Sequence, residues 1–128
     1  MKNERSRRGL TLIEVVVVIT ITAMLMSAVG VYALGALRKA RIDSSKMDVQ
    51  NALSALDMYL AAKGKYPDPG EGFAPVIKIR ALKSEPQDAW GNALTWELRE
   101  GEAIVTSLGA DGVKGGAEDD ADLSSADR

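Results

Sequence analysis

The stretch of the chain best suited to chemistry is an acidic, glycine-rich segment near the C-terminus. Five carboxylates fall within twelve residues there, with three glycines among them. Because like charges held close together repel, a folded segment of this kind requires a counter-cation. Ca²⁺ takes about six to eight oxygen ligands, including backbone carbonyls. The composition predicts either a Ca²⁺ loop, though not an EF-hand, or a solvated and disordered acidic tail. The carboxylates are Asp111, Glu118, Asp119, Asp120 and Asp122.

A second residue with chemical potential is Glu14, the one charged side chain between Gly9 and Leu37. Inside a bilayer an ionised glutamate costs about 2.5 to 3.5 kcal/mol, so a partner is expected. Cleavage after Gly9 would create an α-amine on Leu10, one helical turn before Glu14. With a pKa of about 8 this amine is largely protonated at neutral pH. It could pair with Glu14 of its own chain or of a neighbour; alternatively, Glu14 lies at headgroup level and reaches water.

Composition excludes several classes of site. The chain has no Cys and no His. Disulfides, thiolate metal sites and cysteine nucleophiles are therefore impossible, and the usual general base and the commonest transition-metal ligand are absent. The net charge of -2 argues against electrostatic binding of nucleic acid. Any metal is therefore expected to be a hard cation held by oxygens.

The apolar stretch that carries Glu14 predicts a membrane-spanning helix. It comprises 29 residues, 9–37, between Arg8 and Arg38. At about 1.5 Å per residue a helix of this length exceeds a hydrocarbon core of roughly 30 Å. Its many β-branched residues favour strand in water, but in lipid the backbone must satisfy its own hydrogen bonds, so helix is expected. The basic residues before the span orient the N-terminus to the cytoplasm.

An amphipathic pattern follows the span. Apolar residues recur after Arg38 at spacings of seven, four, three and four, which is typical of a helix with one buried face. Gly64 between two lysines predicts the helix end, and Pro67 follows it. We therefore expect one helix from about Thr11 to Ala62, whose second half packs on a domain of roughly 90 residues. The apolar stripe consists of Ile42, Val49, Leu53, Leu56 and Leu60.

The remaining residues predict turns, a short helix and a hairpin, and hence an α+β fold with a long N-terminal helix on a small antiparallel sheet. Residues 66–73 hold two prolines and two glycines and are expected to turn. Residues 74–82 could form a short helix that Pro75 interrupts early. Alternation predicts a strand over 93–100 and a return strand over 103–108. The inward positions of the first strand are Leu94, Trp96 and Leu98.

The residues around Gly9 resemble a known processing signal. Arg7-Arg8-Gly9-Leu10-Thr11-Leu12-Ile13-Glu14 is similar to the class III signal of type IV pilin-like proteins, with Leu10 where that family most often has phenylalanine. The resemblance implies that a prepilin peptidase cuts after Gly9 and methylates the new N-terminus on Leu10, and that Glu14 guides assembly. Residues 1–9 would then be a leader, 10–37 the transmembrane half of the helix and 38–128 a periplasmic domain.

Later motifs are similar, in the same order, to those of the major pseudopilins of the type II secretion system. They are Tyr66-Pro67, Asp88-Ala89-Trp90-Gly91-Asn92, Ser107-Leu108-Gly109-Ala110-Asp111-Gly112 and Asp120-Ala121-Asp122-Leu123. The resemblance implies a loop that binds one Ca²⁺. The ligands carried over are the carbonyl of Leu108, Asp111, and two of Asp119, Asp120 and Asp122. The family usually continues with isoleucine, glycine, asparagine and tryptophan, where this chain has Leu123-Ser124-Ser125-Ala126.

The function implied by the resemblance is a structural subunit of the pseudopilus. Such a subunit is stored in the bacterial inner membrane, cleaved, and assembled into a periplasmic helical filament that drives protein export. Heterologous packing that does not close a ring yields such a filament. The implied partners are other copies of the chain, minor pseudopilins, the prepilin peptidase, the inner-membrane secretion platform and membrane lipid, but no nucleic acid.

Two alternative functions remain at this stage. The first is a type IV pilin or a DNA-uptake pseudopilin; adhesive pilins typically carry a C-terminal disulfide, which a chain without Cys cannot form. The second is a membrane-tethered periplasmic enzyme, which would need an acid, base or nucleophile in a cleft. The sequence disfavours an enzyme because the carboxylates gather in one loop and no His is available.

Overall fold

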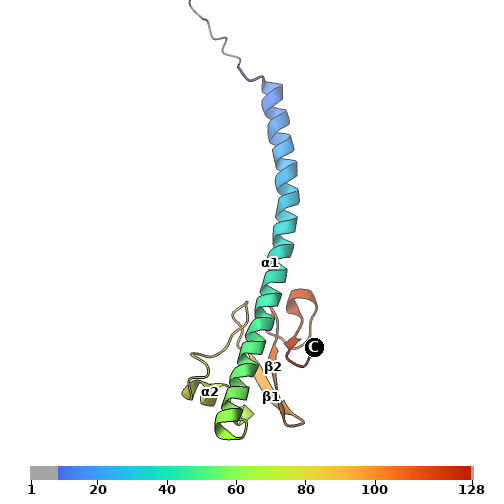
Figure 1. Cartoon of the computed structure of the whole chain (residues 1–128). Coiled ribbons are helices and arrows are strands. Elements are labelled where there is room, and N and C mark those ends of the chain that lie inside the picture. The colour runs from blue at the N-terminus through green and yellow to red at the C-terminus, as the bar shows by residue number, and fades with distance from the viewer. Residues whose placement is uncertain (1–8, 128) are drawn as a thin grey trace, which may run out of the picture. The chain divides into compact units, whose positions relative to one another are not determined.

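One helix, α1 (Leu12–Lys63), continues through both units into which the chain divides between Leu37 and Arg38. The computed structural model describes residues 9–127, so most of the expected leader lies outside the described residues. Figure 1 shows the order of the elements. After α1 come the 3₁₀ turn η1 (Pro69–Glu71), α2 (Ala74–Lys78), β1 (Thr95–Arg99), β2 (Glu102–Ser107), the 3₁₀ turn η2 (Glu118–Asp120) and β3 (Leu123–Ser124).

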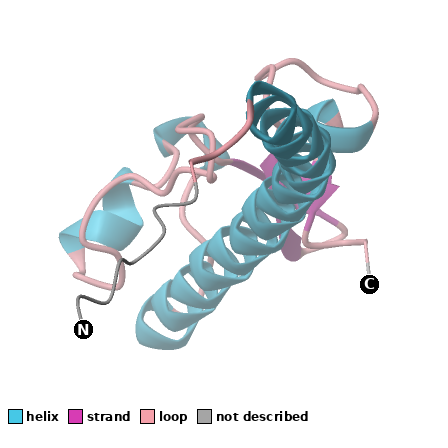
Figure 2. Ribbon diagram, turned by 90° about the horizontal axis from the view of Figure 1, so that it is seen from above, coloured by secondary structure: helices cyan, strands magenta, loops and turns pink. Residues whose placement is uncertain are grey.

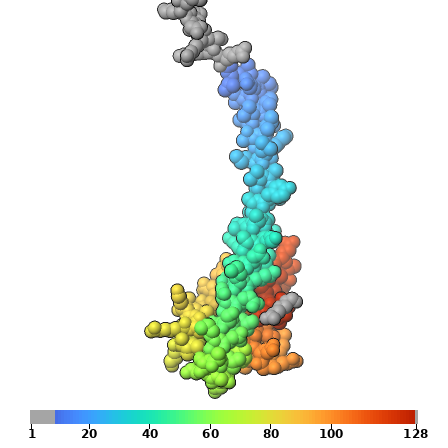
Figure 3. All heavy atoms as spheres, in the orientation of Figure 1, coloured from blue at the N-terminus to red at the C-terminus, as the bar shows by residue number. Residues whose placement is uncertain are grey.

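The first part of α1 carries the features of a membrane span. Among the described residues it belongs to the one helix long and apolar enough to cross a bilayer, and its apolar side chains are exposed (Figure 3). The hydroxyls of Thr20 and Thr22 donate to the carbonyls of Val16 and Val18 at 2.7 and 2.8 Å. Since each hydroxyl donates to a carbonyl of its own helix, neither exposes an unsatisfied donor to hydrocarbon.

In the second unit α1 buries one face, as the apolar stripe predicts. Val49 and Leu56 are fully buried, whereas Ile42, Leu53 and Leu60 are only partly so. The centre of the face consists instead of small residues, which let other elements approach the helix closely: Ser45, Ala52 and Ala55. The helix ends as expected, since Gly64 has φ +75° and donates to the carbonyl of Leu60 at 2.7 Å.

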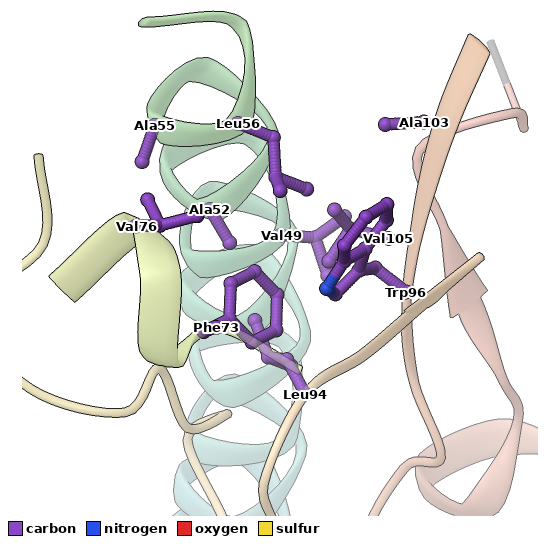
Figure 4. Close-up of a cluster of buried hydrophobic side chains, with 10 residues drawn as sticks. All are labelled: Val49, Ala52, Ala55, Leu56, Phe73, Val76, Leu94, Trp96, Ala103 and Val105. Atoms are coloured by element: carbon purple, nitrogen blue, oxygen red, sulfur yellow. The ribbon is translucent and has the colours of Figure 1, made fainter. Parts of the chain in front are cut away.

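The core of this unit lies between α1, α2 and the strands (Figure 4). Phe73, at the start of α2, packs its ring against that of Trp96, with centroids 6.4 Å apart and planes inclined by 52°. The indole N–H of Trp96 donates to the carbonyl of Gly72 at 2.9 Å, so the buried ring leaves no unpaired donor. The other core residues are Val49, Ala52, Ala55, Leu56, Val76, Leu94, Ala103 and Val105.

The sheet has the order β1-β2-β3 and is antiparallel throughout. The expected hairpin pairs Trp96 with Val105, and its two-residue turn places Glu100 and Gly101 at φ +53° and +88°. Positive φ at both positions matches the twist of the flanking strands. Figure 2 shows these short strands in a unit that otherwise contains much loop. The third strand is not predicted by the sequence: β3 pairs with the end of β2 at Thr106 and Ser107.

Two expectations within this unit need correction. Leu98 does not belong to the core, because its side chain is 43% exposed: it forms the last inward-facing pair before the turn, on the edge strand β1. Pro75 does not interrupt α2 but lies in its first turn, where no helical partner exists for an N–H. The helix instead ends before Arg80, which has φ +63°.

The difference between Leu94 and Leu98 can be tested by the same substitution at both positions. Leu94 is 3% exposed, so we expect Leu94→Ala to lower the free energy of unfolding by about 2 to 4 kcal/mol through lost packing and a cavity. Leu98→Ala should lower it by less than about 1 kcal/mol, in proportion to its smaller buried area. Urea unfolding of the detergent-solubilised chain, followed by tryptophan fluorescence, measures both. Equal losses would contradict the exposed position of Leu98.

Candidate functional site

The described residues at the expected cleavage site are accessible and lie outside the helix. Gly9, Leu10 and Thr11 precede the first turn of α1 and are not helical. The side chain of Leu10 is 76% exposed, and nothing lies within 4 Å of the position that a Cβ on Gly9 would occupy. A peptidase can therefore reach the peptide bond after Gly9 without unfolding a helix.

Glu14 and Leu10 line one surface hollow of about 230 Å³, together with Val15, Val18 and Ile19. The backbone N–H of Glu14 donates to the hydroxyl of Thr11 at 3.3 Å. This bond is half of a capping box, the Thr-x-x-Glu pattern, and it fixes the start of the helix at Leu12. The spacing of Thr11 and Glu14 is the sequence signal from which this helix start can be predicted. The helix start thus places the one carboxylate of the span beside Leu10.

The buried carboxylate of Asp88 helps to position the acidic loop, which comprises residues 109–122. Asp88 is 6% exposed, and its Oδ1 accepts the backbone N–H groups of Trp90 and Asn92 at 3.0 and 2.9 Å. Its Oδ2 accepts the hydroxyl of Ser107 at 2.7 Å. That hydroxyl oxygen accepts the N–H of Gly109 at 3.2 Å, so the network passes from the 88–92 turn to the first residues of the loop. Each donor compensates part of the cost of burying the charge.

Asn92 binds the two residues at which the acidic loop begins, Gly109 and Ala110. Its amide donates to the carbonyl of Gly109 at 2.7 Å and, more weakly, to that of Ala110 at 3.4 Å. The N–H of Ala110 donates to the carbonyl of Asp119 at 2.8 Å, which joins the two ends of the loop. Sequence alone assigns no role to Asp88 or Asn92, because their contacts with Ser107 and Gly109 join residues far apart in the chain.

The carboxylate of Asp48 lies close enough to that of Asp88 for the two charges to interact. Burial and, to a lesser degree, the carboxylate of Asp88 raise the pKa of Asp48 above its ordinary value of 3.8. The ionised form of Asp48 is therefore less favourable in the folded state than in the unfolded state. The free energy of unfolding therefore falls as pH rises from the ordinary pKa of Asp48 to its raised pKa in the folded protein.

The structure does not gather the five carboxylates of the acidic loop into one cluster. Asp111 folds back on its own turn, where Oδ1 accepts the N–H of Val113 at 2.9 Å. Asp119 pairs with Arg38 of α1, at 3.3 Å from Nε, and Glu118 lies 3.9 Å from Nη1 of the same residue. Asp120 is exposed and makes no side-chain hydrogen bond or ion pair with residues 9–127.

Asp122 differs from the other carboxylates. Its Oδ2 accepts the N–H of Gly115 at 3.1 Å, whereas its Oδ1 is buried and has no hydrogen-bond partner in the described part of the chain. Asp122 and Leu108 line the same groove, of about 480 Å³, over the sheet, and Lys114 also lines it. A buried carboxylate oxygen without a donor costs free energy, and a bound cation is one kind of partner that would lower this cost.

The donors present suit a hard cation only if backbone oxygens contribute. Within residues 9–127, no three His, Cys, Asp or Glu side chains come together as a metal-binding group. A set of two carboxylates with carbonyls such as that of Leu108 remains chemically suitable for Ca²⁺, which accepts backbone oxygens readily. The orphaned oxygen of Asp122 fits such a set.

Comparison with known proteins identifies the family. Residues 32–126 match the family described as "Type II secretion system (T2SS), protein G", and residues 5–30 match the "Prokaryotic N-terminal methylation motif". The chain belongs to the type II secretion system protein G family. As a member of that family, it is a pseudopilin subunit of type II secretion, anchored by the apolar part of α1 and facing the periplasm.

Individual relatives match over almost their whole length. The chain is 31% identical to "Type II secretion system core protein G" of Pseudomonas aeruginosa, covering 93% of this chain and 94% of the relative. It is 32% identical to the protein of the same description from Vibrio cholerae, over 96% and 94%. For Escherichia coli K12 the identity is 31%, over 94% and 92%. The similarity therefore includes both the apolar helix and the acidic loop.

Alanine substitutions at two glycines, Gly109 and Gly115, test the geometry of the acidic loop. A Cβ on Gly109 would lie 2.8 Å from the backbone carbon of Asp120, whereas a Cβ on Gly115 would meet nothing within 4 Å. Both glycines have positive φ, +70° and +101°, so alanine is strained at either position. We expect Gly109→Ala to lower the free energy of unfolding by about 2 kcal/mol more than Gly115→Ala, because only Gly109→Ala displaces the 119–121 backbone. Urea unfolding measures the difference, and similar losses would contradict the close approach.

Proposed function

We propose that the chain is cleaved between Gly9 and Leu10, methylated on Leu10, and polymerised through its apolar helix into the periplasmic pseudopilus that drives protein export. The observation that carries this proposal is the exposed apolar surface of α1. Every large apolar side chain from Leu12 to Leu37 is exposed in the isolated chain, and one charge, Glu14, interrupts them. Lipid covers this surface while the subunit is stored, and the same helices of other copies cover it in the filament.

The orientation of the subunit follows from its charges. Arg5, Arg7 and Arg8 precede the span, which places the N-terminus in the cytoplasm with the peptidase and the secretion platform. The second unit, from Arg38 onward, then lies in the periplasm, where filament growth and contact with minor pseudopilins occur. The role proposed is structural and not enzymatic.

Glu14 determines how one copy meets the next. After cleavage, the α-amine of Leu10 carries a positive charge at the same helix end as the Glu14 carboxylate. An unpaired carboxylate in lipid is costly, so a neighbour's α-amine beside Glu14 stabilises one axial position of the two helices. Screening by salt is weak in this environment, which makes the pair stronger than a surface ion pair.

Removal of the Glu14 charge should abolish assembly but not insertion. We expect Glu14→Gln and Glu14→Leu to reduce crosslinked multimers from membranes of secreting cells more than about tenfold, the effect of losing roughly 1.4 kcal/mol per contact. Monomer abundance should hold, because the span becomes more apolar. Glu85→Gln removes an exposed carboxylate from the second unit and serves as the control.

The same samples test processing. Intact mass should correspond to a chain that begins at methylated Leu10, in the wild type and in both Glu14 variants. An N-terminus that retains residues 1–9 would contradict the cleavage. Parallel loss of monomer and multimers would indicate that Glu14 serves stability instead of assembly.

The acidic loop is proposed to bind one Ca²⁺. Asp122, whose buried Oδ1 lacks a donor, Asp111 and the carbonyl of Leu108 would hold it. The metal would supply the positive charge that allows these oxygens to be close together in the folded loop. Asp119, which pairs with Arg38, and the exposed Asp120 are the less suitable members of the set inferred from the family.

Calcium should therefore stabilise the second unit. At free Ca²⁺ a hundredfold above the dissociation constant, binding contributes about 2.7 kcal/mol, which raises the Tm of a domain of this size by about ten degrees or more. Thermal melts of the full chain in detergent, in Ca²⁺ and in chelator, measure the shift. The chain contains two tryptophans, Trp90 and Trp96, both in the second unit, so their fluorescence reports on that unit.

Variants and a second metal make this test specific. Asp111→Ala and Asp122→Ala should abolish the shift, whereas Glu85→Ala, at an exposed carboxylate outside the groove, should preserve it. Mg²⁺ should do much less than Ca²⁺, because it demands tighter octahedral geometry. Identical wild-type melts in Ca²⁺ and chelator would exclude the metal and leave the assembly proposal intact.

A further inference from the structure

The acidic loop already contacts a positive charge of its own chain. Arg38, near the middle of α1, places Nε 3.3 Å from Oδ2 of Asp119 and Nη1 3.9 Å from Oε2 of Glu118. Arg38, Glu118 and Asp119 all lie in the second unit. The structure therefore contains a clasp between the helix and the loop, which we define as Arg38, Glu118 and Asp119.

The backbone of the loop is shaped so that both acids reach Arg38. Glu118 has φ +55°, a left-handed conformation that a residue with a Cβ adopts only at some cost. It follows Gly115 and Gly116, at φ +101° and +95°, and a Cβ on Gly116 would collide with the carbonyl oxygen of Asp120. The chain thus turns sharply at residues 115–118, and the turn places two consecutive carboxylates beside one guanidinium.

The two carboxylates do not contribute equally. The Glu118 side chain is 84% exposed and that of Arg38 is 63% exposed, so solvent screens their attraction strongly. The Asp119 side chain is only 28% exposed, and its contact is shorter. Most of the coupling in the clasp is therefore expected between Arg38 and Asp119.

We infer that Arg38 is a positioning residue that acts as an internal counter-cation of the acidic loop, and that it withholds Asp119 from the metal. The inference rests on the proposed Ca²⁺ site and divides its carboxylates into two groups. Asp119 and Glu118 are compensated by Arg38, whereas Asp122, with its unpartnered Oδ1, and Asp111 are left for the cation. The clasp keeps this part of the loop folded in the absence of metal.

A double-mutant cycle tests the first half of the inference. Arg38→Gln, Asp119→Asn and the double variant are made in the full chain and melted in detergent with chelator present, with tryptophan fluorescence as the signal. Each single variant should lower the Tm by about 2 to 5 °C, as expected for one largely exposed ion pair in a domain of this size. The double variant should lower it no further than either single one, since the contact is lost only once.

A matched arginine controls for the change in net charge. Arg41 lies on the same helix, is exposed, and makes no ion pair with the residues that the structure describes. Arg41→Gln should leave the Tm within about 1 °C of the wild type. The Arg38–Asp119 coupling should also shrink in 1 M NaCl, because it is an exposed electrostatic interaction.

The response to Ca²⁺ tests the second half. Asp119→Asn should retain the Ca²⁺-induced rise in Tm, whereas Asp122→Asn should lose it. Arg38→Gln should widen that rise, because the loop then depends more on the metal for its folded state. A merely structural arginine would lower the Tm equally in Ca²⁺ and in chelator.

Several outcomes would overturn the inference. Additive losses in the cycle, or an Arg41→Gln variant that behaves like Arg38→Gln, would remove the counter-cation role. Loss of the Ca²⁺ shift in Asp119→Asn would make Asp119 a ligand. A wild-type chain without any Ca²⁺ shift would exclude the metal half together with the proposed Ca²⁺ site, while the cycle in chelator would still decide the role of Arg38.

Discussion

The buried carboxylate of Asp88 joins two parts of the second unit, and the next residue, Ala89, adds a contact with a third. The carboxylate accepts two N–H groups of its own turn and the hydroxyl of Ser107 at the end of β2. The next residue, Ala89, donates to the hydroxyl of Ser45 on α1 at 3.0 Å. A buried charge is tolerated only while its donors stay in place, so the turn and the end of β2 are held together. The hydrogen bond from Ala89 to Ser45 adds α1 to this contact. The start of the acidic loop, at Gly109, belongs to the same hydrogen-bond network.

A single helix serves two environments because its side-chain pattern changes along its length. Up to Leu37 large apolar side chains are exposed along the helix and Glu14 is the one charge, which suits lipid or a bundle of like helices. From Arg38 onward one face is buried, and several of its residues are small, among them Ala52 and Ala55. Small residues allow Phe73 and Val76 to pack close to the helix, so a domain of this size forms a core with few large side chains.

Charge compensation in the acidic loop is distributed over different partners. Arg38 contacts Asp119 and Glu118, and backbone N–H groups contact Asp111 and Asp122. One oxygen of Asp122 remains buried without a donor in residues 9–127. The tail beyond it is held by β3 and by Ser125, which exchanges hydrogen bonds with Val105 through its N–H and its hydroxyl oxygen. The small side chain of Ser125 is thus buried beside β2.

The sequence by itself determined the features that depend on neighbours along the chain. The span, the helix end at Gly64 and the hairpin all follow from local periodicity and turn chemistry, and the motif around Gly9 and Glu14 indicates the family. Tertiary structure alone decided which acids of the loop share a partner, because Arg38 and Asp119 are far apart in the chain. It also decided the strand β3 and the exposure of Leu98. Two residues carry too weak a propensity to predict a strand, and the burial of one leucine depends on what covers the edge of the sheet.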